Sequence, residues 1–529
     1  MNTSSSRRIL FTFMAVLVLA VVAPVRAEDF GHGFSDGAAS SGLSGDYKRG
    51  SRFSLAMPGV LTVTHAMLDG GGGPQTGFQS VSMVVYQDAN GVPGAKLAQS
   101  APLKIAAGFT VAWVDFSMGS VPLLAGNYWL VLHTAGPSDG STPGIIRDYG
   151  SSNRQPPNWY GNADTFADGA STPFGAGSTG AVELLVYGTY LPSSKARFTA
   201  RANLAATPSG GLTSNTKRGS RFILSEPGRL FALAAYVDGK GGASGSQKLR
   251  YSLYRDSGGV PTSRVVESEE VTIKAGQSAS WVSARVLPTD VVAGNYWIVI
   301  HTGDTSGVTR DFGDGAANWY SNADTYADGA ASSFGTGNSG TVTLTASAMY
   351  IPGVVQTQTL GRTTIATTPS GGLSANFSRG SEFGGLAITN AGVVTAFWAY
   401  LDGNGGGSGS QQVRIAVYAD PLTHNLDAEK AFESEVVSIP AGTSPRWVRF
   451  PLKAPVEIEQ NPAYWIMLQS GSTAGIVRNY GDGPANWAGF ADPFADGAVS
   501  DFSPGGPGVS HGTVTLSLYI ESAVPGTTQ

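Results

Sequence analysis

The chain has 529 residues, contains no cysteine and carries a formal net charge of −5, with charged residues making up 13%. It therefore has no disulfide, no thiolate chemistry and no lipid anchor on cysteine, and its sparse, weakly acidic charge argues against nucleic acid or anionic membranes as partners. Glycine is abundant, at 72 residues, which indicates many tight turns between short strands.

Residues 1–27 are predicted to be a signal peptide. Arg7 and Arg8 provide the positive start, residues 9–22 form the apolar run, and a Val-Arg-Ala tripeptide places small residues ahead of cleavage before Glu28. An uncleaved N-terminal anchor is the alternative. No later stretch approaches 18 continuous apolar residues. We therefore expect a secreted or cell-surface-associated chain with no membrane insertion after signal cleavage.

One sequence unit occurs three times. The heptapeptide "YKRGSRF" at 47–53 returns as "TKRGSRF" at 216–222 and as "FSRGSEF" at 377–383. A repeat spacing of roughly 165 residues is too long for a solenoid and suits whole domains. The predicted units, joined by short polar linkers, are residues 29–192, 203–352 and 363–522.

Each unit has the pattern of a β-protein. In the second unit, runs such as "RLFALAAYV", "NYWIVIHT" and "TVTLTASAMY" are rich in β-branched and aromatic residues. Several alternate apolar and polar residues, and turns rich in Gly, Asp and Asn separate them. The sequence therefore predicts an all-β fold of three tandem antiparallel β-sandwich domains, each resembling a jelly roll.

An acidic phrase closes each unit's loop region. "NADTFADGA" at 162–170 returns as "NADTYADGA" at 322–330 and as "FADPFADGA" at 490–498. Carboxylates, an Asn amide and backbone carbonyls in a glycine-bearing loop suit structural Ca²⁺. The predicted calcium ligands are Asn162, Asp164, Asp168, Asn322, Asp324, Asp328, Asp492 and Asp496.

The same phrase has two other interpretations. It can be an Asx-type turn whose glycine is left-handed and whose aromatic residues, Phe166, Tyr326 and Phe494, are buried pegs. It can also supply the paired carboxylates of a glycosidase. Three complete active sites in one chain would be unusual, so the duplication favours binding or scaffolding over catalysis.

An Asn-Trp pair precedes each phrase, and an Arg with an Asp or Asn precedes that pair. A tryptophan ring can cover the C–H face of a sugar while amide, carboxylate and guanidinium groups pair with its hydroxyls. The alternative is that the tryptophan plugs a loop end of the sandwich. The predicted ligand-binding residues are Arg147, Asn158, Trp159, Tyr160, Arg310, Asn318, Trp319, Tyr320, Arg478, Asn486 and Trp487.

Other motifs argue against specific chemistries. Two glycine-rich loops, at 175–180 and 335–340, have dinucleotide-binding spacing but lead into strand-like sequence instead of a helix. His133 and His301 occupy equivalent positions, but Gln469 stands there in the third unit. A histidine-based nucleophile or zinc site would thus be missing from one unit, and we expect surface or edge-strand histidines.

Two further segments, "YQDANGVPG" at 86–94 and "YRDSGGVP" at 254–261, complete a recognisable series. With the "RGSRF", "AGNYW" and "NADxxADG" motifs, the chain resembles a β-sandwich repeat of secreted bacterial proteins that often occurs in tandem. In outline it also resembles jelly-roll carbohydrate-binding modules. The third copy departs from the series at 418–427. The resemblance implies export and a sandwich fold.

These observations predict a non-catalytic, exported protein that recognises glycan or another surface polymer. Weak sites on one chain would add through effective concentration if two can engage the same polymer. A structural cell-surface or matrix component that self-associates through sheet edges is the first alternative. A polysaccharide hydrolase or lyase that uses one aspartate pair is the second.

Overall fold

The computed structural model describes residues 28–152, 159–384, 388, 390–420, 428–458, 463–504 and 506–525. The predicted signal peptide and Asn158 lie outside these residues. The described chain forms six antiparallel sheets, so the predicted all-β fold is confirmed. The helices of the described residues are two 3-10 turns, η1 (Pro137–Asp139) and η3 (Phe494–Asp496).

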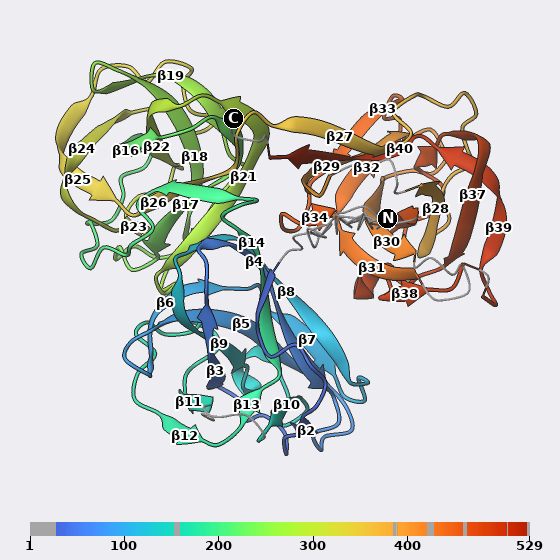
Figure 1. Ribbon diagram of the computed structural model, residues 1–529, viewed down its shortest axis with the longest axis horizontal. Coiled ribbons are helices and arrows are strands. Elements are labelled where there is room, and N and C mark those ends of the chain that lie inside the picture. The colour runs from blue at the N-terminus through green and yellow to red at the C-terminus, as the bar shows by residue number, and fades with distance from the viewer. Residues whose placement is uncertain are drawn as a thin grey trace, which may run out of the picture.

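Each repeat contributes two sheets. We call the sheet that contains β4, β17 or β29 the central sheet, and the sheet that contains β9, β22 or β35 the outer sheet. Figure 1 shows three lobes, in which the hairpins β11–β12, β24–β25 and β37–β39 lie at the rim and β8, β21 and β34 lie toward the middle.

In the first repeat both sheets have seven strands. The central sheet has β1 (Glu28–Gly31), β14 (Val186–Pro192), β4 (Gly59–Asp69), β10 (Arg147–Ser151) and β13 (Glu183–Leu184) in order, with β2 (Ala38–Ala39) on β10 and β8 (Ala112–Leu123) on β4. The outer sheet has β12 (Ser178–Gly180), β11 (Trp159–Ala163), β3 (Tyr47–Leu55), β9 (Gly126–Thr134), β5 (Phe78–Asp88) and β6 (Pro93–Gln99), with β7 (Leu103–Ala106) on β5.

The second repeat follows the same plan. Its central sheet has β15 (Arg197–Ala200), β26 (Ala346–Pro352), β17 (Gly228–Asp238) and β21 (Ser280–Val291) in order, with β23 (Arg310–Asp311) on β17. Its outer sheet has β19 (Val260–Glu267), β18 (Ser246–Ser257), β22 (Gly294–Thr302), β16 (Thr216–Leu224), β24 (Gly313–Ala323) and β25 (Asn338–Leu344), with β20 (Val271–Lys274) on β18.

The third repeat adds short strands to the same plan. Its central sheet has β27 (Gln356–Gly361), β40 (Leu518–Val524), β29 (Gly392–Asp402) and β33 (Arg446–Phe450), with β34 (Glu457–Ile458) and β36 (Arg478–Asn479) on β29. Its outer sheet has β38 (Asp501–Phe502), β31 (Ala428–Glu433), β30 (Ser410–Asp420), β35 (Ala463–Ser470), β28 (Phe377–Gly384), β37 (Gly481–Ala491) and β39 (Ser510–Leu516), with β32 (Val437–Pro440) on β30.

The segments expected as linkers contain strands. β15 pairs with β26 and β27 pairs with β40, each being the last strand of the repeat that follows the segment, and β1 pairs with β14 in the same way. In the second and third repeats, the first strand of the central sheet therefore comes from the connecting segment. This arrangement leaves little free chain between one repeat and the next.

All three pairs of repeats are in contact. The apolar core of the first repeat continues into residues of the second, including Tyr236 and Trp281, which are 4% and 5% exposed. Polar contacts join each pair: Tyr236 Oη donates to Lys96 O at 2.8 Å, Ser117 Oγ donates to Lys453 O at 3.0 Å, and Arg285 lies 3.5 Å from Glu435. These contacts hold the three lobes as one body (Figure 1).

The middle strands of the outer sheets, β9, β22 and β35, are buried on both faces. On β9, Tyr128, Leu130 and Leu132 face the core between the sheets, whereas Trp129 and Val131 face away from it, yet all five are at most 5% exposed. A strand covered on both faces reads as a continuous apolar run, which explains "NYWLVL". The segment that covers its outer face is the loop of the acidic phrase.

Candidate functional site

In each repeat the acidic phrase starts in a turn held by the residue before the RGS strand. Asp46 has a φ of 50°, and its Oδ1 accepts a hydrogen bond from the backbone N–H of Phe166 at 2.9 Å. Asn215 and Asn376 also have a φ of 50°. The equivalent bonds run from Tyr326 N–H to Asn215 at 2.9 Å and from Phe494 N–H to Asn376 at 3.3 Å. Asp and Asn tolerate this left-handed backbone better than other side chains do.

The features expected of a turn are present. Phe166, Tyr326 and Phe494 are 8%, 5% and 8% exposed, so the prediction that they are buried pegs is confirmed. The closing glycines are left-handed, with φ values of 77°, 81° and 85° at Gly169, Gly329 and Gly497. The phrase thus has a structural role in all three repeats.

A buried lysine binds the first carboxylate of the phrase in the first two repeats. Lys48 is fully buried, and its Nζ lies 3.0 Å from Asp164 Oδ2, which also accepts a hydrogen bond from Ser171 N–H at 2.8 Å. Lys217 and Asp324 form the same pair at 3.1 Å. Burial lowers the pKa of Lys48, and the charge of Asp164 opposes that shift. The carboxylate is therefore already neutralised from within the protein.

A buried histidine supports the same loop, so the expectation of surface or edge-strand histidines is wrong. His133 is fully buried, and its Nε2 donates to the Asp164 carbonyl at 3.1 Å; His301 donates to Asp324 in the same way. Burial lowers the pKa of His133. In the third repeat, Gln469 Nε2 lies 3.4 Å from the Asp492 carbonyl. An amide can replace the imidazole because only an N–H donor is needed.

The third repeat closes the loop without the lysine. Ser378 stands in its place, and its Oγ donates to Asp492 Oδ2 at 2.6 Å. Arg414, on strand β30, donates to the Phe494 carbonyl, as Arg250 on β18 donates to the Tyr326 carbonyl in the second repeat. Asp492 is 1% exposed, and burial raises its pKa. Its charge is therefore less compensated than that of Asp164.

The far end of the loop is tied to the sheet edge. Lys96 Nζ donates to the Ala170 carbonyl at 2.8 Å, while Gln99 Oε1 accepts from Ala170 N–H at 2.9 Å. Lys430 and Glu433 hold Ala498 at 2.8 and 3.1 Å in the third repeat. Burial lowers the pKa of Lys96 to about 7. These ties use side chains of β6 and β31.

An aromatic cluster lies beneath the loop. Tyr160 belongs to it, with its ring centroid 5.6 Å from that of Phe174, and its hydroxyl accepts from Gly177 N–H at 3.0 Å. Tyr320 makes the equivalent contacts in the second repeat, at 5.6 Å to Phe334 and 3.2 Å to Gly337. Ala488 replaces this tyrosine in the third repeat, where Phe502 fills the cluster. Both tyrosines thus join the loop to the sheet.

The three candidate tryptophans are partly buried at the rim of the sandwich. Trp159, Trp319 and Trp487 each pair across the hairpin with a glycine and pack against the apolar core between the sheets. A Cβ at Gly180 would lie 2.2 Å from the indole Nε1 of Trp159, so the ring covers this glycine. Part of each ring is buried and part faces solvent.

The arginine nearest each tryptophan comes from the RGS motif. The guanidinium carbons of Arg49, Arg218 and Arg379 lie 5.0, 5.3 and 5.4 Å from the ring centroids of Trp159, Trp319 and Trp487, which is cation–π distance. These arginines were not among the ligand-binding residues predicted from the sequence. The threefold recurrence of "RGS" was the signal that could have found them.

The predicted arginines are held elsewhere. Arg147 Nε and Nη2 donate to Asp69 at 2.9 and 2.7 Å, and Tyr149 also bonds this carboxylate. The hydrogen bonds from Arg147 have the largest effect, and together these contacts lower the pKa of Asp69 to about 2. The equivalent bidentate pairs are Arg310 with Asp238 and Arg478 with Asp402. The arginines lie on β10, β23 and β36 of the central sheets, whereas the tryptophans lie on the outer sheets.

A chain of contacts still connects the two sheets in the first two repeats. Arg49 lies over Trp159 and also 3.2 Å from Asp148, the neighbour of Arg147. Arg218 pairs with Asp311 at 3.1 Å, and burial raises the pKa of Asp148 and of Asp311.

Asn486 of the third repeat bonds Glu382 at 2.5 Å. The side chain of Asn318 lies outside the described part of the structure.

The predicted calcium ligands are not part of a larger cluster of acidic or histidine side chains among the described residues. No group of three His, Cys, Asp or Glu side chains placed to hold a metal occurs among the described residues. Asp168 and Asp328 are exposed, and the side chain of Asp496 lies outside the described set. Asn162 Nδ2 donates to Phe174 O at 2.8 Å, and Asn322 donates to Phe334 O. Calcium binding stays a prediction for these loops.

Comparisons with known proteins do not identify the chain. No protein-family model matches it, and no curated protein matches it. Within the described residues, no helix has the length and apolar character needed to cross a membrane. The function must therefore be argued from the residues and their geometry.

Proposed function

We propose that the chain is an exported, non-catalytic binding protein of three jelly-roll-like β-sandwich domains that recognises glycan or another surface polymer. The observation that carries this proposal is the placement of the three tryptophan-bearing hairpins. They lie at the rims of three lobes, away from the contacts that join the lobes to one another (Figure 1). One rigid body thus presents three related surfaces outward.

The chemistry of the hairpins suits an uncharged, hydroxyl-rich polymer. Ser178, Asn338 and Ser510 occupy equivalent exposed positions, each two residues before the glycine that pairs with the tryptophan and therefore on the tryptophan's face of the sheet. Two of them carry a hydroxyl group and one carries an amide. Small hydroxyl and amide groups next to a partly exposed aromatic ring can bond sugar hydroxyls and cover a sugar face.

The state of the aspartates supports binding over catalysis. A general acid in a glycosidase needs a carboxyl group that faces the substrate and a second carboxylate across the cleft. Asp164 and Asp324 are bound to buried lysines, and Asp492 is 1% exposed. Their partners Asp168 and Asp328 point to the exposed side of the loop. The pairs thus do not act together on a substrate.

A fixed spacing between the three lobes allows weak binding sites to act together on one polymer. When one site holds a polymer, a second site on the same body meets it at a high effective concentration, provided that the polymer spans the two. The strands within the connecting segments and the contacts between lobes fix this spacing. We therefore expect binding to long chains to be much tighter than binding to short oligosaccharides.

Affinity electrophoresis of the mature chain through gels loaded with different polysaccharides tests the proposal. One polymer should retard the chain, and the triple variant S178A/N338A/S510A should lose most of that retardation. The control triple variant K104A/T272A/S438A changes equivalent exposed positions on the edge strands β7, β20 and β32. It should run as the wild type does. Equal retardation of both variants would place the site elsewhere.

Each gel is run with calcium and with chelator. If chelator weakens the retardation, the acidic loops bind structural calcium. If chelator has no effect, the loops are stabilised by their hydrogen bonds and ion pairs alone. Absence of retardation by any polymer would remove the glycan proposal.

A structural role in a cell surface or matrix is the second candidate. β25 and β39 end their sheets and carry exposed residues along most of their length. Such edges can pair with another strand. Concentration-dependent assembly in light scattering, without any polymer, would favour this role.

A further inference from the structure

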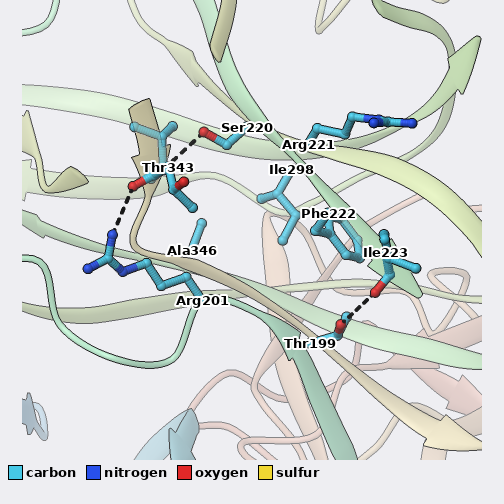
Figure 2. Close-up of a pocket in the computed structure, with 10 residues that line it drawn as sticks. Thr199, Arg201, Ser220, Arg221, Phe222, Ile223, Ile298, Thr343 and Ala346 are labelled. Carbon is cyan, nitrogen blue, oxygen red and sulfur yellow. Dashed lines mark hydrogen bonds between the residues drawn. The ribbon is translucent and has the colours of Figure 1, made fainter. Parts of the chain in front are cut away.

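The second repeat contains a cleft between its two sheets. Its volume is about 330 Å³, within the size range of small-molecule sites. Figure 2 shows the lining residues converging from β15, β16, β22 and the β25–β26 segment. Apolar side chains dominate its floor: Phe222, Ile298, Leu344 and Ala346.

The cleft exists because one position of the first strand lacks a large side chain. By strand register, Phe30 pairs with Gly188, Thr199 with Ala348, and Leu360 with Ile520. These positions are equivalent in the three repeats. Phe30 is 5% exposed and packs edge-on against Tyr128 and Tyr190, and Leu360 is 1% exposed. Thr199 lines the cleft instead of filling it.

The gap continues past Thr199 toward the core. A second void of about 10 Å³ is lined by Thr199 and Phe222 together with Leu253, Val291 and Tyr296. That volume is close to the minimum for one water molecule, and the apolar lining offers it no partners. The inner end of the gap is therefore suited to the end of an apolar chain.

The entrance of the cleft is also apolar, and only the second repeat has a large apolar side chain at this position. Ile223 is 68% exposed at the mouth of the cleft, and Thr199 Oγ1 donates to its carbonyl at 3.2 Å. The register with the neighbouring strand places Ser54 and Gly384 at the same position in the other repeats. Two independent positions of the second repeat thus combine to open a path from solvent to the core.

Two arginines, Arg201 and Arg221, line the rim of the cleft, and the Arg221 side chain is 34% exposed. Arg201 Nη1 bonds the Asp314 carboxylate, and these side chains are 21% and 46% exposed. Arg221 is held by Asp256, which is 6% exposed. A solvent-exposed pair is weak, so Arg201 can share its charge with an incoming anion. Asp256 holds Arg221 more firmly because it is buried.

We propose that this cleft binds the alkyl chain of a small amphiphile whose anionic head lies beside Arg201. A cavity of about 150 Å³ holds one benzene ring, so about 330 Å³ accommodates roughly twice that number of heavy atoms. A straight chain of ten carbons with a carboxylate matches this size. A free fatty acid and the acyl tail of a lipid share this chemistry.

Isothermal titration of the full chain with decanoate tests the proposal. The wild type should bind one decanoate per chain. Thr199→Leu, which copies the third repeat, should raise the Kd at least tenfold by filling the gap. The double variant T199F/A348G, which copies the first repeat, should do the same, because a phenylalanine there needs the space that Gly188 provides opposite Phe30. Thr199→Val is the matched control, since it removes the hydroxyl and keeps the space, and it should bind within twofold of wild type.

The outcomes separate clearly. Equal decanoate binding by wild type and Thr199→Leu would show that the probe binds elsewhere and would overturn the proposal, as would no binding by wild type at millimolar decanoate. A second titration with vesicles of an anionic phospholipid distinguishes the source of the chain: binding lost in Thr199→Leu would assign an acyl tail, and no vesicle binding alongside decanoate binding would assign a free acid. Polysaccharide retardation should be the same in all these variants, so this test is independent of the glycan proposal.

Discussion

The acidic loop of the first repeat closes over a buried ion pair, whereas that of the third closes over a buried carboxylate that lacks one. Lys48 lies 3.0 Å from Asp164, while the equivalent Ser378 gives Asp492 a single hydroxyl at 2.6 Å. The backbone bonds that start the loop are the same, since the residue before the RGS strand accepts from the loop in both.

This difference shows which contacts define the loop. The Asx bond, the left-handed glycine and the aromatic peg occur in every repeat, whereas the charge that faces the first aspartate changes. His133 and Gln469 likewise serve as N–H donors of different chemistry to the same carbonyl. The loop conformation is therefore set by backbone bonds and packing, and the ion pair neutralises a charge that the fold has buried.

The largest effect should come from breaking the ion pair. Lys48→Met leaves the carboxylate of Asp164 without a cation in a buried site, which should cost about 3–5 kcal/mol. The double variant K48M/D164N removes both charges and should recover most of the loss. Thermal and urea unfolding followed by tryptophan fluorescence would measure both. If K48M were as stable as K48M/D164N, the prediction that the ion pair neutralises a buried charge would be contradicted.

Removing the carboxylate should have opposite effects in the two repeats. Asp164→Asn leaves Lys48 unpaired and should destabilise by about 1–3 kcal/mol, whereas Asp492→Asn should be neutral or stabilise by up to about 1 kcal/mol, because it removes an uncompensated buried charge. Unfolding of the two variants under the same conditions checks the contrast. Equal losses would indicate that Arg414 already neutralises Asp492.

The difference in stability between Asp492→Asn and the wild type should also depend on pH. Burial raises the pKa of Asp492 in the folded chain above its ordinary value of 3.8. The stability that protonated Asp492 contributes to the folded chain is therefore fully present below pH 3.8, and it is lost as the pH rises through the folded-state pKa. The advantage of Asp492→Asn over wild type should thus be largest at neutral pH and shrink as the pH falls toward 3.8. Stability curves of both proteins from pH 7 to 4 would show it, and a constant difference would contradict it.

The smallest loss of stability, equal in all repeats, should come from replacing the residue that starts the turn. Asp46→Ala, Asn215→Ala and Asn376→Ala each lose one backbone bond and force alanine to a φ of 50°, which should cost about 1–2 kcal/mol each. Asn215→Gly keeps the backbone freedom without the bond and should cost less. Hydrogen exchange of the loop amides measures the local loss. Clearly unequal losses would mean that the charge differences also shape the turn.

The sequence was informative where a local pattern decides the structure. Alternating apolar strands and glycine-rich turns predicted the all-β fold, and the aromatic pegs of the acidic phrase were predicted correctly from turn chemistry. The recurrence of three units was visible from motifs alone. Each of these rests on bonds or periodicities that span only a few residues.

Other features could not be read from the sequence because they join distant residues. The burial of His133 depends on a loop more than thirty positions away folding over the sheet, and the partner of Asp164 lies 116 positions earlier, in the RGS strand. The proximity of Arg147 to the tryptophan in sequence suggested a shared site, but successive strands of a sandwich alternate between sheets. Arg49, from a neighbouring strand, lies over the ring instead.

The sequence by itself therefore determined the class of fold, the repetition and the short turn from the aromatic peg to the glycine of each acidic loop, because short-range backbone preferences and side-chain periodicity suffice for them. Only the tertiary structure decided which charges meet, that the connecting segments become strands, and that the second repeat is open where its neighbours are filled. These depend on strand register between segments more than a hundred residues apart. A single side chain, Thr199 in place of Phe30 or Leu360, then decides whether two sheets close or leave a cleft.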